Sequence, residues 1–129
     1  MLKLTSENKK KWLEGLATLP KTRHWLRSDI GYCCLGVGAK VLFGMTEEFL
    51  RENTTLSSII YQGKQVVFPN DNFKEVLTQN ISGEMLAYTP PSIPLPRFSR
   101  HMTVEDYLGN INDSTFTFDE VIHVINTFL

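Results

Sequence analysis

The sequence predicts one compact α+β domain, in which four or five helices pack with a small, mostly antiparallel sheet. Two observations support this fold class. Apolar residues at three- and four-residue spacing follow capping residues in several segments, which is typical of amphipathic helices. Shorter runs rich in β-branched and aromatic residues lie beside glycine or proline, which is typical of strands. A chain of 129 residues has the usual length of one domain, and we expect residues 1–129 to share one core.

Each helix is predicted from a capping residue and an apolar stripe. Thr5 or Ser6 can cap the first helix, and Asn70 or Asp71 can cap a later one. Thr103 stands in the same position before another apolar stripe. The longer helices are expected at residues 5–19, 34–43, 70–79, 103–112 and 117–128, with a short helix at 46–52.

Two of these helices have distinctive sequences. Residues 34–43 are almost wholly apolar, a pattern that fits a buried strand as well as a buried helix. The length of this segment and the Gly44 that follows it favour a helix, which we expect at the centre of the core. Before the last helix, Thr117 and Glu120 have the spacing of a capping box. Phe116 and Val121 have the spacing of the hydrophobic staple that accompanies such a box.

Two hairpins are predicted to supply the sheet. The residues Ser28-Asp29-Ile30-Gly31 are typical of a tight turn, which pairs residues 25–27 with residues 31–33. Residues 58–61 and 65–68 are apolar runs joined by Gln62-Gly63-Lys64, which predicts a second hairpin.

Residues 81–97 complete the predicted organisation. Residues 81–88 fit a helix or a strand, and we expect a further strand there. Residues 89–97 contain four prolines, which exclude a helix interior. We expect this segment to be an extended loop or arm of the same domain, able to cross a groove or clasp a partner.

Composition excludes several classes of partner and compartment. The formal net charge of −1 gives no overall attraction to duplex nucleic acid or to an anionic membrane. The chain has neither an apolar leader nor a run of about 18 apolar residues, so we expect no membrane span. Cys33 and Cys34 are adjacent, and an ordinary disulfide needs a longer Cα separation. We therefore expect two reduced thiols and a cytoplasmic protein.

Three motifs resemble those of a family of small tailed-phage and prophage proteins. These motifs are Lys11-Trp12-Leu13-Glu14-Gly15-Leu16, Tyr32-Cys33-Cys34-Leu35-Gly36-Val37, and residues 108–118 with Asn112-Asp113. Gly15 and the continuation Gly38-Ala39-Lys40 depart from the family pattern. The resemblance implies a phage origin, the host cytoplasm and an accessory role such as countering host defence. It implies no particular activity.

The first candidate binding group is Arg23, His24, Trp25, Arg27 and Tyr32. In a strand, residues 23, 25 and 27 share one face, and Tyr32 could join them across the predicted hairpin. Arginine binds phosphate through two hydrogen bonds, and tryptophan offers a face on which a base can stack. The alternative is a solvated strand edge with Trp25 partly buried.

Two further groups could contact the same ligand. Asn112 and Asp113 could bind a hydroxyl or an amine, or they could cap the turn before the last helix. Arg97 and Arg100 flank Phe98 at the end of the proline-rich segment. They could close over a ligand or simply lie in solvent.

Cys33 and Cys34 are candidate nucleophiles because a helix N-terminus favours a thiolate. His101 or His123 would then have to act as the base, oriented by Asp113. The alternative, which we favour, is that both thiols are small core residues. The chain lacks the cysteine and histidine spacings of a metal site, so we expect no metal and no cofactor.

These observations lead to a leading functional hypothesis and two alternatives. We expect a non-catalytic phage accessory protein that sequesters a host-derived ligand, with a nucleotide second messenger as the preferred ligand. The first alternative is a cysteine hydrolase that uses Cys33 or Cys34. The second is a protein-binding inhibitor of a host enzyme, which would use residues 89–97 together with Phe98 and Arg100. Each of these functions is compatible with a homo-oligomer.

Overall fold

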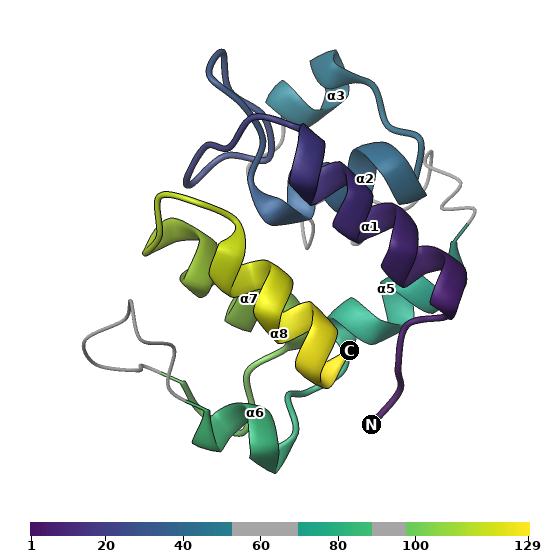
Figure 1. Ribbon diagram of the computed structural model, residues 1–129, viewed down its shortest axis with the longest axis vertical. Coiled ribbons are helices and arrows are strands. Elements are labelled where there is room, and N and C mark those ends of the chain that lie inside the picture. The colour runs from purple at the N-terminus through teal and green to yellow at the C-terminus, as the bar shows by residue number, and fades with distance from the viewer. Residues whose placement is uncertain (53–69, 89–97) are drawn as a thin grey trace.

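The computed structural model describes residues 1–52, 70–88 and 98–129. Within these residues 58% of positions are helical and no sheet is formed, so the predicted α+β class is wrong. The helices are α1 (Ser6–Thr18), α2 (Cys34–Leu42), α3 (Glu47–Arg51), α5 (Asp71–Thr78), α6 (Gly83–Ala87), α7 (Val104–Asp113) and α8 (Asp119–Phe128) (Figure 1).

Most predicted helices begin at their predicted caps. The side chains of Thr5, Asn70 and Thr103 each accept a hydrogen bond from a backbone N–H in the first turn of α1, α5 and α7. The capping box before α8 is wrong, because α8 begins after Phe118 without a side-chain cap. The carboxylate of Glu120 instead accepts a hydrogen bond from Tyr88 Oη at 3.4 Å.

The predicted strands fail for local reasons. Residues 81–88 contain α6, because Ser82 Oγ caps a helical turn that buries Met85. The hairpin at 25–33 is reduced to one antiparallel bridge, between Arg27 and Tyr32. His24, which precedes the predicted hairpin, has φ of 71°, so the extended backbone does not continue back to Arg23. The second hairpin, at 58–68, and the proline-rich segment at 89–97 lie outside the described residues.

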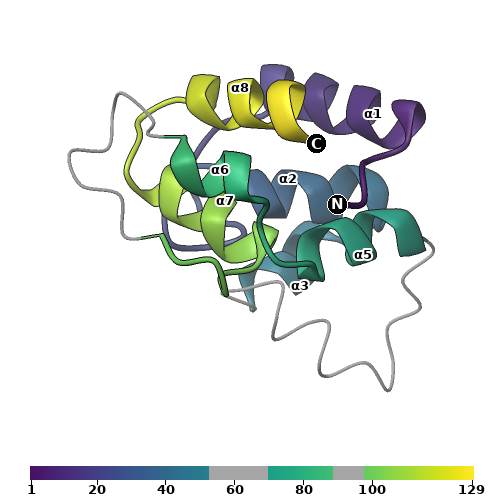
Figure 2. The same cartoon turned by 90° about the horizontal axis from the view of Figure 1, so that it is seen from below.

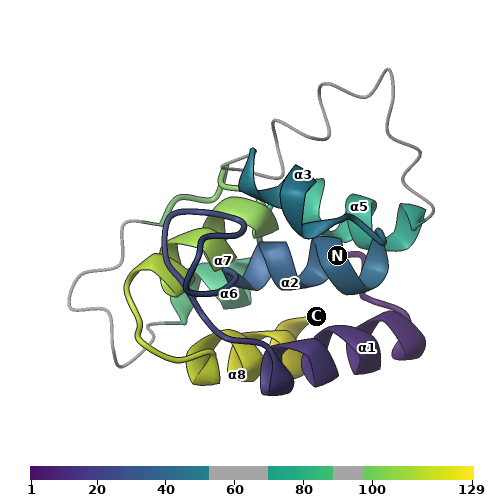
Figure 3. The same ribbon diagram turned by 90° about the horizontal axis from the view of Figure 1, so that it is seen from above.

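The helices form two layers (Figures 2 and 3). α1 and α8 lie side by side in one layer, while α2, α5 and α7 form the other. The core between them buries large apolar side chains from both layers, which is the arrangement expected for one domain. The largest fully buried side chains are Trp12, Leu26, Tyr32, Leu50, Phe73, Leu77, Met85, Tyr107, Leu108 and Ile111.

α2 lies at the centre of the packing, as predicted, and residues of neighbouring segments lie very close to its backbone. Trp12 Nε1 donates a hydrogen bond to the carbonyl of Cys34 at 2.9 Å. A Cβ on Gly38 would lie 2.5 Å from the Phe73 ring, and a Cβ on Gly36 would lie 1.9 Å from the Leu26 carbonyl oxygen. Gly36 therefore permits the contact between α2 and the loop containing Leu26, and Gly38 permits the contact between α2 and Phe73 of α5.

The length and apolar character of the helices decide whether any of them could cross a membrane. Among the helices of residues 1–52, 70–88 and 98–129, none has the length and apolar character that crossing a bilayer requires.

Candidate functional site

The connecting loop, residues 19–33, joins α1 to α2 and is anchored to the end of α7. Asn112 is fully buried, and its Oδ1 accepts a hydrogen bond from the Cys34 N–H at 3.0 Å. Its Nδ2 donates to the Thr22 carbonyl at 3.1 Å. Asn112 therefore caps α2 across the interface between two elements, and these contacts use both ends of its amide.

Lys21 provides a second anchor for the connecting loop. Its ammonium donates to the carbonyls of Asn112 at 2.9 Å and Thr115 at 2.6 Å. Burial of this ammonium lowers the pKa of Lys21 below its usual value. Lys21 thus joins the connecting loop to the last turn of α7 and the turn that follows it.

His24 and Asp113 form the next contact along the loop. The His24 N–H donates to Asp113 Oδ1 at 2.8 Å, and His24 Nδ1 lies 3.3 Å from Asp113 Oδ2. The left-handed backbone of His24 turns its N–H toward this carboxylate. The structure thus brings together two predicted site residues that are far apart in sequence.

Arg23 and Phe116 meet at the outer edge of this junction. The Arg23 guanidinium carbon lies 4.8 Å from the centre of the Phe116 ring. Phe116 is 84% exposed, and Trp25, two residues after Arg23, is 50% exposed. We use the name aromatic surface for Arg23 and Phe116, which are in contact, together with Trp25, which is exposed on the same loop as Arg23. Phe116 was expected to pair with Val121 as the hydrophobic staple of the last helix, whereas its exposure identifies it as a surface residue.

Arg27 and Tyr32 belong to a different cluster. The Arg27 guanidinium carbon lies 4.5 Å from the centre of the Tyr32 ring, and Arg27 donates to the carbonyls of Ser28 and Gly31. Residues 23, 25 and 27 therefore do not act as one strand face, because the backbone at His24 breaks the alternation.

Arg100 is remote from the connecting loop. It is exposed and precedes α7, whereas Asp113 ends the same helix. The ten residues of α7 separate the two ends by about 15 Å. Arg97 lies outside the described residues.

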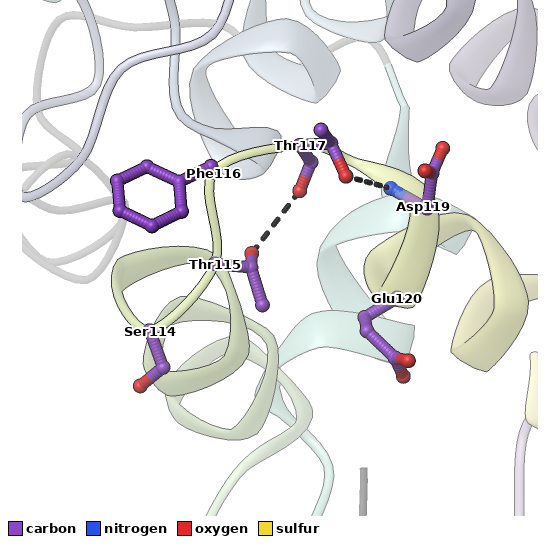
Figure 4. A pocket seen from close by; sticks show the side chains of 6 residues that line it. All are labelled: Ser114, Thr115, Phe116, Thr117, Asp119 and Glu120. Atoms are coloured by element: carbon purple, nitrogen blue, oxygen red, sulfur yellow. Dashed lines mark hydrogen bonds between the residues drawn. The ribbon is translucent and has the colours of Figure 1, made fainter. Parts of the chain in front are cut away.

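The α7–α8 turn, residues 114–118, borders an open hollow of about 430 Å³ (Figure 4). Thr115 Oγ1 donates to the Thr117 carbonyl at 3.1 Å, and Thr117 Oγ1 accepts from the Asp119 N–H at 3.4 Å. Figure 4 shows the Phe116 ring on the opposite side of the turn from Asp119 and Glu120. These contacts hold the backbone that presents Phe116.

The two thiols are positioned as core residues. Cys33 and Cys34 are buried, with Cys33 Sγ accepting a hydrogen bond from the Gly36 N–H at 3.3 Å. Burial raises the pKa of Cys33 to about 11 and the pKa of Cys34 well above its usual value. His101 and His123 are exposed, and His123 contacts the Tyr88 ring. The described residues contain no group of three metal-ligating side chains close enough to hold an ion.

Iodoacetamide at neutral pH should therefore leave both cysteines unmodified in the folded protein. A rise in pKa from 9 to about 11 lowers the thiolate fraction of Cys33 by about 100-fold, and burial restricts access further. Mass spectrometry after timed labelling measures this, with the protein in concentrated urea as the control. Rapid labelling of either thiol in the folded protein would contradict the core assignment.

The fold and the contacts above define a small helical domain whose connecting loop and α7–α8 turn present cationic and aromatic side chains. Comparisons with protein families, with curated proteins and with solved structures give no match for this chain.

Proposed function

We propose that this protein is a non-catalytic binding protein whose aromatic surface binds a phosphate-bearing nucleotide. One observation carries the proposal: the Arg23 guanidinium lies over a Phe116 ring that is 84% exposed. The stacked ring orients the guanidinium, and the planar edge of that group suits a phosphate.

The charges of the connecting loop favour Arg23 as the phosphate contact. The side chains of Lys21, His24 and Arg27 are engaged with carbonyl or carboxylate oxygens. Arg23, in contrast, forms no side-chain hydrogen bond or ion pair with the residues that the structure describes. Its hydrogen-bond donors are therefore available to an external anion.

The exposed rings supply the contact for a base. Stacking of a base on an aromatic side chain contributes about 1–3 kcal/mol and tolerates different bases. Trp25 and Phe116 lie on two segments that Asn112 and Lys21 join. A ligand with both a phosphate and a base fits this arrangement, because its phosphate can contact Arg23 while its base stacks on one of these rings.

Binding without catalysis agrees with the chemistry of the buried thiols. The raised pKa of Cys33 keeps its thiol protonated at neutral pH, and His101 and His123 are exposed on other elements. We therefore propose sequestration of the ligand in preference to the hydrolase alternative. The resemblance to small phage proteins supports a role as an accessory protein that withholds a signalling nucleotide from host defence.

A protein partner is the second candidate. Ile30 is 76% exposed and lies in the same connecting loop as Trp25. Tryptophan and arginine are enriched among the residues that dominate protein interfaces, and an exposed isoleucine adds apolar area. This observation favours an inhibitor of a host enzyme that docks against the loop.

Calorimetric titration with a panel of cyclic and linear nucleotides tests the proposal. We expect Arg23→Ala to weaken binding by about tenfold to 150-fold, since a hydrogen bond to a charged group contributes about 1.5–3 kcal/mol. Phe116→Ala should also weaken binding, whereas Lys10→Ala removes an exposed cation of α1 and should not. Chromatography of the denatured complex should release an intact nucleotide.

The same variants separate the two candidates. If the protein binds none of the nucleotides in the panel, the nucleotide proposal is overturned. Capture of a host protein that Trp25→Ala and Ile30→Ala both abolish would support the second candidate.

A further inference from the structure

A second cluster of charges surrounds the hydroxyl of Tyr32. Tyr32 Oη donates a hydrogen bond to Glu47 Oε1 at 2.6 Å. Arg27 and Lys40 lie against the Tyr32 ring, at 4.5 Å and 5.7 Å from its centre. Lys40 Nζ also lies 3.8 Å from Glu47 Oε1. Figure 1 shows α3, which carries Glu47, at the same end of the molecule as the connecting loop.

Three cations act on the Glu47 carboxylate. The hydrogen bond from Tyr32 is the largest influence that lowers the pKa of Glu47, and Arg27, Lys40 and Arg51 lower it further. Arg51 Nη2 also lies 3.5 Å from the exposed carboxylate of Asp29. The surroundings of Glu47 thus stabilise a negative charge from several directions.

The donors around Glu47 are not all used. Arg27 Nε is buried and has no hydrogen-bond partner among the residues that the structure describes. Buried donors without a partner are uncommon in proteins, and a bound water or ion is one of the explanations for such a donor. Lys40 approaches a single carboxylate oxygen at a distance longer than a normal hydrogen bond.

We infer that Arg27, Tyr32, Lys40 and Arg51 form an oxyanion site, in which the Glu47 carboxylate is a resident occupant that a phosphate group displaces. The inference is independent of the proposed function, because it uses none of the three residues of the aromatic surface. It assigns Tyr32 and Arg27 to anion binding, but at a different place from Arg23.

A phosphate group matches this site better than the resident carboxylate. At neutral pH a phosphate monoester carries a charge of about −1.5 to −2 and offers three acceptor oxygens. The Glu47 carboxylate carries one negative charge and two oxygens. Lys40 lies 3.8 Å from the resident carboxylate, and Arg27 and Arg51 also favour negative charge there, so the additional charge of phosphate is compensated.

The resident side chain can leave without disturbing the core. The side chain of Glu47 is 51% exposed, so a change of rotamer carries its carboxylate into water. The Tyr32 ring is buried and stays in place, which keeps the hydroxyl donor aimed at the site.

Titration with inorganic phosphate at constant ionic strength tests the site, with binding followed by phosphorus NMR. We expect Glu47→Ala to bind phosphate at least about tenfold more tightly than the unmodified protein, because it removes the competing carboxylate. Glu48→Ala is the matched control, since it removes the same charge from the neighbouring position of α3. Adding Tyr32→Phe to Glu47→Ala should abolish the gain.

Two results would overturn the inference: equal phosphate affinity of Glu47→Ala and Glu48→Ala, or a gain that persists after Tyr32→Phe. Circular dichroism checks that each variant folds. If Glu47→Ala does not fold, Glu47→Gln is used in its place. Adenosine monophosphate in place of phosphate, tested with Arg23→Ala present so that the aromatic surface does not contribute, distinguishes the ligand source: tighter binding indicates a nucleotide phosphate, and equal binding indicates the free anion. Arg23→Ala should leave the gain unchanged, which separates this site from the aromatic surface.

Discussion

Replacing Gly36 with alanine should destabilise the protein by about 3 kcal/mol or more. The new Cβ would lie 1.9 Å from the carbonyl oxygen of Leu26 and 2.7 Å from its carbonyl carbon. These are backbone atoms, so no change of rotamer relieves the overlap. The Leu26 carbonyl also accepts a hydrogen bond from the Cys33 N–H, and this bond must break if the loop moves away from α2.

Urea unfolding followed by circular dichroism measures the effect. Gly83→Ala is the matched control, because no atom of residues 1–52, 70–88 or 98–129 lies within 4 Å of the position of its new Cβ. Alanine in a helix should leave the free energy of unfolding unchanged or raise it by up to about 1 kcal/mol. A Gly36→Ala variant as stable as the unmodified protein would show that the loop does not pack against α2 in this way.

Asn112→Ala should have the second largest effect, a loss of about 2–4 kcal/mol. The substitution leaves the buried Cys34 N–H and the partly buried Thr22 carbonyl without their partner. Each buried polar group without a partner costs about 1–3 kcal/mol. The aromatic surface should also be affected, because Asn112 joins the loop that carries Arg23 to α7.

Asn110→Ala is the control for this prediction. Asn110 is exposed on the same helix, and among the described residues its side chain bonds only to the Asp106 carbonyl. Its removal should change the free energy of unfolding by no more than about 0.5 kcal/mol. Similar stabilities for the two variants would exclude Asn112 as the anchor of the connecting loop.

The helices were predictable where a cap and an apolar stripe occur together. Thr5, Asn70 and Thr103 are such caps, and the expected helices at these positions are confirmed. α6 was missed because its five residues are too few to show a helical period, even though Ser82 is a good cap. The α7–α8 turn was misassigned because Thr117 and Glu120 have capping-box spacing but find other partners.

The candidate site was only partly predictable. The sequence identifies Arg23, His24 and Asp113 as polar residues with binding chemistry, but their meeting depends on the left-handed backbone of His24. No periodic pattern indicates that conformation, since a non-glycine residue seldom adopts it. Glu47 was missed altogether, because its contact with Tyr32 depends on how α3 packs.

The double anchoring by Asn112 affects how the connecting loop meets a ligand. One buried side chain bonds to Thr22 near the start of the loop and to Cys34 just beyond its end, so the intervening residues span two tethered points. Each side chain that must be immobilised on association removes about 0.5–1.5 kcal/mol from the affinity. A ligand at this loop meets a preorganised surface and loses less entropy on binding. Association then needs no slow ordering step, so differences in affinity between ligands should arise mainly from their rates of dissociation.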